Sequence, residues 1–175
     1  LRLLKRERSE YNRLFYWLNV VVRYRAGLGI SGFGFTELFP VQMPYPSLGI
    51  LDTDYGDLTA QKIFWLSFGI VPWYQVFAGI LEVSAGTMLF FRKTVPIGAA
   101  LLVGALGAIV VVNFAYDGGV HVYSSYFVLL SLYLLVPYYK PFYNLFVKEI
   151  AAKIELYLPR FKPTFNFLRV SLQAF

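Results

Sequence analysis

The chain has 175 residues, of which 58% are hydrophobic and 15% are charged, with a mean hydropathy of +0.56. Soluble domains carry about 25% charged residues, so this composition excludes an ordinary water-soluble domain. The net charge is +6, but the lysines and arginines flank apolar runs and form no basic patch interleaved with aromatic residues, which excludes a nucleic-acid partner. With no cysteine and one histidine, the chain cannot by itself hold an iron–sulfur cluster, a thiolate zinc site or a bis-histidine haem, and it binds no cofactor covalently.

Four apolar segments are long enough to cross a membrane, which takes about 20 mostly apolar residues. They cover residues 14–39, 73–91, 95–114 and 120–136. The third and fourth segments contain no charged residue, with only His121 at one end. In the second segment, eight apolar residues contribute about −0.5 kcal/mol each to insertion, and Glu82 at its centre costs about +3 kcal/mol. We therefore predict an all-α, four-helix transmembrane bundle in which the second span depends on a neighbouring helix.

The distribution of basic residues predicts the orientation. Lysines and arginines precede the first segment, join the second to the third, and follow the fourth, whereas the opposite side carries Lys62 and several aspartates. Under the positive-inside rule both termini face the cytoplasm. The sequence thus predicts a multi-pass protein of the bacterial inner membrane.

The long connection over residues 40–72 and the C-terminal tail lie outside the spans. We predict a short outer, interfacial helix over residues 58–70, with Asp57 as its N-cap and Pro72 after its end. After Pro141, apolar residues share one stripe of a cytoplasmic amphipathic helix over residues 142–158. The predicted organisation is a membrane domain over residues 1–141 and a tail over residues 142–175, and the tail would dock other subunits of a membrane complex or lie on the bilayer.

Four charged residues interrupt the apolar segments and define a predicted polar centre: Arg23, Arg25, Glu37 and Glu82. A charge at mid-membrane costs roughly 2.5–3.5 kcal/mol on insertion scales and therefore marks a function or a partner. Small residues share a helix face with these charges, which lets two backbones approach closely. We expect Glu82 to meet Arg23 or Arg25. Three interpretations stay open: an ion pair that fixes helix register, a Glu82 that accepts a proton or binds a ligand, and a charge satisfied by another subunit.

Residues 27–32 match the dinucleotide-binding pattern GxGxxG letter for letter. That pattern needs a preceding strand and a helix start, and here it lies inside a predicted membrane helix. Close helix packing explains these glycines better.

A second polar cluster is predicted at the outer turn between the third and fourth spans, formed by Asn113, Tyr116, Asp117 and His121. An aspartate with a histidine can relay protons or bind a cation. A capped, solvated helix turn explains the same residues. The ligands are too few for a metal site, and we predict none.

Several short motifs in order give the chain a resemblance to the DoxX-like family of small bacterial four-helix membrane proteins, in its longer form with an extended first outer loop. The motifs lie at residues 23–24, 32–35, 39–40, 55–57, 77–86, 91–94, 113–120 and 123–124. The resemblance implies a four-helix bundle with cytoplasmic termini. It also implies a role either in thiosulfate:quinone oxidoreduction or as a membrane partner of redox enzymes. The positions it carries over are Arg23, Glu82, Asn113, Tyr116 and Asp117. Similar sequences often have a lysine where this chain has Glu37, which places a second acid in the membrane.

Three functions follow as hypotheses. The first is an accessory or scaffolding subunit of a larger membrane complex, linked to quinone through the resemblance, and surrounded by lipid. The second is a quinone-reducing oxidoreductase subunit in which Arg23 and Glu82 are the candidate catalytic residues. The third is a transporter of protons or small molecules along Glu37 and Glu82. The sequence does not decide whether the protein is an enzyme.

Overall fold

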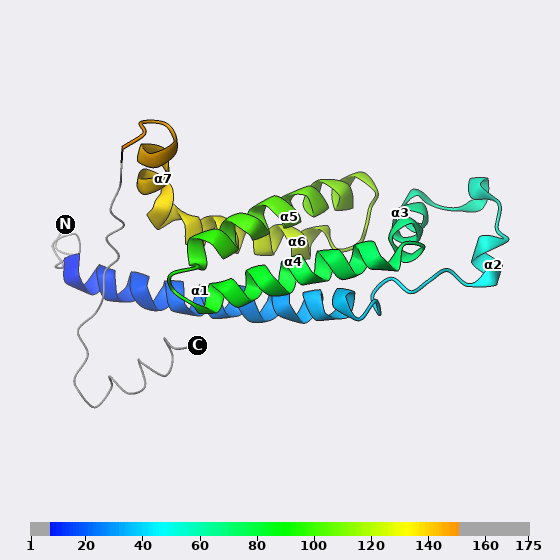
Figure 1. Ribbon diagram of the computed structural model, residues 1–175, viewed down its shortest axis with the longest axis horizontal. Helices are drawn as coiled ribbons and strands as arrows, with labels where there is room; N and C mark the ends of the chain where they lie inside the picture. The colour runs from blue at the N-terminus through cyan, green and yellow to red at the C-terminus, as the bar shows by residue number, and fades with distance from the viewer. Residues whose placement is uncertain (1–7, 151–175) are drawn as a thin grey trace, which may run out of the picture.

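The computed structural model describes residues 8–150, and side chains from residue 11 onward. This part of the chain is helical and contains no strand. Four long helices run side by side along the molecule: α1 (Arg8–Leu38), α4 (Pro72–Phe90), α5 (Val95–Ala115) and α6 (His121–Leu135) (Figure 1). Shorter elements occupy the two ends: α2 (Leu48–Leu51), η2 (Tyr55–Asp57), α3 (Ala60–Gly69), η3 (Val136–Tyr138) and α7 (Tyr139–Phe146).

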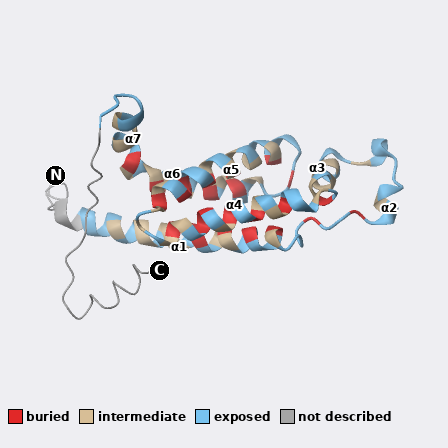
Figure 2. Ribbon diagram, in the orientation of Figure 1, coloured by how far each residue is buried: buried red, intermediate tan, exposed pale blue. Residues whose placement is uncertain are grey.

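The long helices pack as two antiparallel pairs. Helix α1 packs along α4, and α5 packs along α6. The two pairs are joined by contacts between α4 and α5 and between α1 and α6. Buried residues lie on the sides of the helices that face one another (Figure 2). Proline in the first turn of both α4 and α5 suits the helix start, where a missing N–H costs nothing. The apolar core consists of Ala26, Ile30, Ala85, Leu89, Val95, Ala99, Leu102, Leu106, Phe127, Leu134 and Tyr138.

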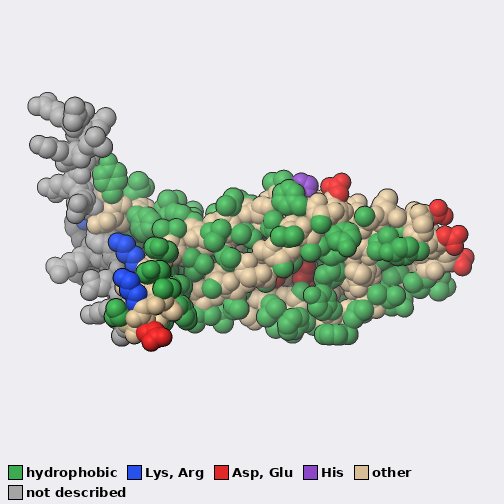
Figure 3. Space-filling view, turned by 90° about the horizontal axis from the view of Figure 1, so that it is seen from above, with side chains coloured by type: hydrophobic (Ala, Val, Ile, Leu, Met, Phe, Trp, Pro, Cys, Tyr) green, Lys and Arg blue, Asp and Glu red, His purple; other side chains and the backbone are tan. Residues whose placement is uncertain are grey.

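Two of the described helices, residues 95–115 and the continuous stretch 121–146, are long and apolar enough to cross a membrane. Helices α3 and α4 meet at an angle of 87° and together pass the same test, so the count rises to three if this bent pair is one span. Hydrophobic side chains cover the middle of the molecule, and charged ones gather at its ends (Figure 3). This surface suits a surrounding membrane, because soluble proteins rarely expose apolar patches of this extent.

The outer helix begins later than its sequence predicts. Helix α3 starts at Ala60, and its cap is Thr59, whose hydroxyl oxygen accepts a hydrogen bond from the Lys62 backbone N–H at 3.2 Å. The predicted cap, Asp57, instead belongs to the preceding turn of η2 and makes no capping bond. Both residue types cap helices well, so sequence alone did not separate them.

The C-terminal helix is shorter than predicted. Helix α7 begins at Tyr139, before Pro141, and ends at Phe146. The chain then turns: the Ile150 backbone N–H donates to the Asn144 carbonyl at 3.0 Å, and Glu149 adopts a left-handed φ of 55°. The predicted helix over 142–158 therefore breaks after little more than one turn, at Phe146, and its part beyond residue 150 lies outside the described residues.

Candidate functional site: a buried acidic pair between α1 and α4

Glycine lets the backbones of α1 and α4 touch. A Cβ placed on Gly79 would lie 2.5 Å from the Leu38 backbone nitrogen and 2.6 Å from the Gly34 carbonyl oxygen. One on Gly86 would lie 2.6 Å from Ser31 Oγ, and one on Gly34 would lie 2.8 Å from a Val83 methyl group. The small residues predicted to share a face in each helix thus form one seam, which confirms that part of the sequence analysis.

Glu37 and Glu82 are buried in the half of this seam that lies nearer the connection over residues 39–71. They are 8% and 5% exposed, and one carboxylate oxygen of each, Oε2, has no hydrogen-bond partner among the described residues. The two side chains are close enough to interact electrostatically, and no other charged group acts on Glu82 within residues 8–150. In Figure 3, acidic atoms are visible in a recess amid the hydrophobic surface of the middle of the molecule. The structure therefore brings two acids together without a cation.

The expected ion pair with Arg23 is wrong. Arg23 donates from Nε to the Leu89 carbonyl at 2.9 Å and from Nη2 to the Phe90 carbonyl at 2.7 Å. Leu89 lies seven residues beyond Glu82, which is about 10 Å along the helix. Arg23 thus binds the carbonyls that the last turn of α4 leaves unpaired, where a positive charge also favours the helix dipole.

Arg25 does not reach Glu82 either. Its side chain is exposed on the other side of α1, with the guanidinium carbon 5.4 Å from the centre of the Tyr126 ring and 5.6 Å from that of Phe127. A cation over an aromatic face gains roughly 0.5–2 kcal/mol. The four residues of the predicted polar centre therefore separate into an acidic pair and two arginines with different contacts.

Gln75 is a buried polar residue that the sequence analysis missed. It is fully buried in the first turn of α4 and faces the backbone of Met43. In the amide orientation that satisfies both groups, its nitrogen donates to the Met43 carbonyl at 3.2 Å and its oxygen accepts from the Met43 N–H at 3.0 Å. This contact fixes the outer connection on the end of α4. A glutamine inside an apolar span was the available signal.

Three further polar side chains in the bundle contain unpaired atoms. Ser31 Oγ, Ser131 Oγ and both amide atoms of Asn113 are buried without a hydrogen-bond partner in the described part of the chain. Asn113 and Ser131 are fully buried. Unpaired buried polar groups are rare and mark strain, function or an absent binding partner. The polar interior is thus larger than the charged residues alone indicated.

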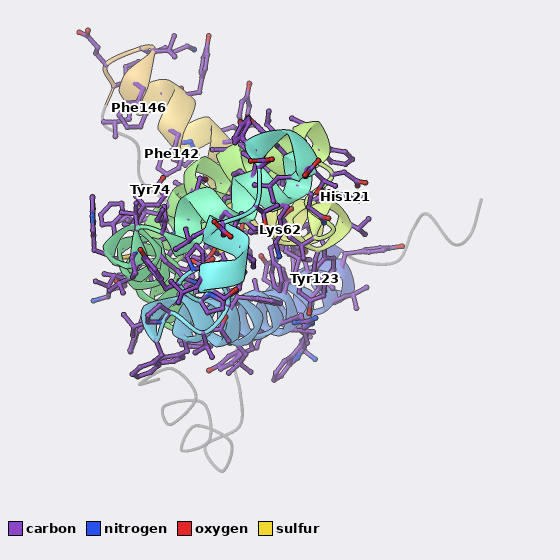
Figure 4. The ribbon with its side chains drawn as sticks, turned by 90° about the vertical axis from the view of Figure 1, so that its right-hand side faces the viewer. Lys62, Tyr74, His121, Tyr123, Phe142 and Phe146 are labelled. Atoms are coloured by element: carbon purple, nitrogen blue, oxygen red, sulfur yellow. The ribbon has the colours of Figure 1, made fainter. Side chains whose placement is uncertain are left out.

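The outer cluster lies in one turn but does not form one site. Asn113 points into the bundle, Tyr116 stacks on Phe64 of α3 with ring centres 5.3 Å apart, and Asp117 is exposed with a φ of 51°. His121, at the outer end of α6 (Figure 4), packs its ring against Phe114, and its Nδ1 has no hydrogen-bond partner within residues 8–150. These contacts give no sign of an Asp117–His121 proton relay.

The acidic pair is the arrangement with the clearest chemistry. A buried carboxylate without a cation is costly, whereas a carboxylic acid or a carboxyl pair that shares a proton is not. Two buried carboxyl groups that interact electrostatically can therefore hold a proton inside the bundle. No group of three histidine, cysteine or acidic side chains in the described residues is arranged to hold a metal ion.

The comparisons with known proteins add one relative. No protein-family model matches the chain, and no solved structure matches it. The chain is 30% identical over 87 residues to a protein of Bacillus subtilis (strain 168) named "Uncharacterized protein YwoB". That match covers 50% of this chain and 56% of the relative's length. The chain is therefore similar to YwoB over about half of each protein, and this similarity does not extend far enough to place it in a family.

Proposed function

We propose that this protein is a multi-pass protein of the bacterial inner membrane, with both ends on the cytoplasmic side, which moves protons through the Glu37–Glu82 pair. The observation that carries the proposal is the burial of two neighbouring carboxyl groups with no cation beside them in the described part of the chain. In this scheme all four long helices cross the membrane, including α1 with its four arginines. The basic turn after α4 and the two ends of the described chain then lie at the same end of the bundle.

A proton fits this pair better than a metal cation does. Ca²⁺ takes six to eight oxygen ligands, and Mg²⁺ requires a near-octahedral set. The next polar side chain along the seam is that of Ser31. It lies beside Gly86, which is one turn of α4 away from Glu82. A proton needs only a carboxyl oxygen at each step. Gln75 and Asn113, buried toward the outer end, would extend the polar path in that direction.

Proton flux into liposomes tests the proposal. Purified protein is reconstituted in vesicles that contain a pH-sensitive dye, and a potassium diffusion potential drives uptake. We expect wild-type flux above that of protein-free vesicles, and at least about a tenfold loss in Glu82→Gln and Glu37→Gln, because general acid–base groups contribute factors of this size or more. Asp117→Asn, which removes an exposed carboxylate, is the control and should retain flux. Wild-type flux no greater than in empty vesicles, or an unchanged Glu82→Gln, would contradict the proposal.

An accessory subunit of a larger membrane complex is the second candidate function, and α7 favours it. This helix turns away from the bundle (Figure 1) and exposes aromatic and aliphatic side chains, among them Phe146, which is 76% exposed. Partner subunits would cover this surface. Extraction from native membranes in mild detergent should then give a species larger than the monomer, and Phe146→Ser should shift it to lower mass. A lone monomer in native extracts would rule this candidate out.

The quinone-reducing alternative gains nothing from the geometry. It requires Arg23 and Glu82 to act on one head group, and Arg23 is bound to the carbonyls at the far end of α4. We propose a relation to DoxX-like proteins on the sequence motifs alone, and the link to quinone follows only from that relation.

A further inference from the structure

Arg25 is the exposed charge in the middle of the bundle's surface. It stands beside Tyr126 and Phe127, which belong to the central turns of α6. Helix α6 is part of a stretch long and apolar enough to cross a membrane, so the guanidinium lies at the depth of the hydrocarbon when α6 spans it. An arginine at that depth that points away from the bundle interior is expected to have a partner.

The local structure is built to hold this guanidinium in place. A Cβ on Gly29 would lie 2.7 Å from Arg25 Nη1 and 2.5 Å from Phe127 Cζ, so glycine leaves room for the arginine to extend along α1. Tyr123 lies where α6 faces α1 (Figure 4), with its ring 5.1 Å from that of Phe33. The aromatic rings lie on one side of Arg25, and the arginine side chain itself is exposed.

Residues 8–150 bring no acid to this arginine. The groups that act electrostatically on Arg25 in the described residues are tyrosines and include no carboxylate. A second copy would not supply one at this depth from its described residues, because their acids are buried in the seam, placed in the connections at the ends, or, for Glu10, placed in the first turn of α1. Those in the connections are Asp52, Asp54, Asp57, Asp117 and Glu149.

We propose that the face formed by Arg25, Tyr123 and Tyr126 docks a transmembrane helix of a different protein that carries an aspartate or glutamate near mid-span. Charge complementarity selects this partner, because a carboxylate both neutralises the guanidinium and accepts its N–H donors in a bidentate contact. The tyrosine hydroxyls add donors around it, and the rings pack against the apolar part of the partner helix. This docking requires the chain to lie in the membrane and is independent of proton movement through Glu82.

Energy transfer between the protein and synthetic membrane peptides tests the proposal. The chain has no cysteine, so one dye is placed by Leu48→Cys, at a position in α2 that is 85% exposed and lies outside the face formed by Arg25, Tyr123 and Tyr126. The probes are polyleucine transmembrane peptides with one central glutamate, or glutamine in its place, in phosphatidylcholine vesicles. We expect the glutamate peptide to associate about tenfold more tightly, as one strong charge-assisted contact would give.

Variants assign the effect to the arginine. Arg25→Met should abolish the preference for glutamate, Arg25→Lys should keep part of it, and Arg13→Met, which removes another arginine of α1, should keep all of it. Circular dichroism establishes that each variant is folded. Equal association of the two peptides, or a preference that survives Arg25→Met, would overturn the proposal. Loss of the preference in vesicles that contain phosphatidylglycerol would also overturn it, because an anionic lipid would then occupy the site. Energy transfer between two labelled copies without peptide, if Arg25→Met removed it, would do the same, because a second copy would then be the occupant.

Discussion

Replacing Gly79 by leucine should separate α1 from α4 and prevent the protein from folding. The added side chain would begin 2.5 Å from a backbone nitrogen and 2.6 Å from a carbonyl oxygen of α1, and neither atom can move aside without moving the helix. Even alanine at this position should cost about 1–3 kcal/mol in the free energy of unfolding, the usual range for overpacking. Detergent denaturation followed by circular dichroism measures both variants.

Gly104 provides the matched control. It lies in the middle of α5, and a Cβ there would meet nothing within 4 Å. Gly104→Leu should stay within about 0.5 kcal/mol of wild type, as surface substitutions usually do. If Gly79→Leu and Gly104→Leu unfold at the same denaturant concentration, the close approach of α1 and α4 is not what holds the bundle together.

Replacing Glu37 by lysine should stabilise the bundle while it abolishes proton flux. Within the described part of the wild-type chain, the charged group that acts on Glu82 is another acid, so an ammonium group at position 37 would give Glu82 a counterion. Interacting neighbours typically show coupling free energies of about 0.5–3 kcal/mol, and we expect an attractive value in this range. A gain in stability together with a loss of proton flux would show that the acid at position 37 serves proton movement and not stability.

A double-mutant cycle measures that coupling. Glu37→Lys, Glu82→Gln and the double variant are unfolded in parallel, and Asp117→Lys supplies the same change of charge at an exposed position outside the seam. Zero coupling between positions 37 and 82 would show that the two carboxyl groups do not meet. A gain in stability from Asp117→Lys equal to that from Glu37→Lys would assign the effect to net charge instead.

The sequence predicted the long helices because their ends carry strong local signals. Pro72 opens α4, the basic pair Arg92 and Lys93 follows its end, and the predicted range 73–91 differs by one residue at each end from the observed one. Helical periodicity also identified correctly which small residues share the seam, since residues three and four apart lie on the same face.

The partners of the charged residues could not be predicted in the same way. Periodicity gives the face of a helix but not the level at which it packs against another, and residues 39–71 connect α1 to α4 without fixing that level in any way visible from sequence. The structure places Gly34, rather than Arg23, opposite Glu82. Gln75 was missed for a related reason, because its partner is the backbone of a distant loop residue, Met43.

Carbodiimide labelling tests most directly whether a carboxyl pair is hidden from water within the bundle. Hydrophobic dicyclohexylcarbodiimide adds to protonated carboxyl groups in membranes, and mass spectrometry locates the product. We expect this reagent to modify Glu82 or Glu37, and the corresponding glutamine variant to lose that modification. A water-soluble carbodiimide that modifies Asp117 should react little with either residue. Reaction of Glu37 and Glu82 with the water-soluble reagent as fast as Asp117, or no modification by the hydrophobic one, would contradict this expectation.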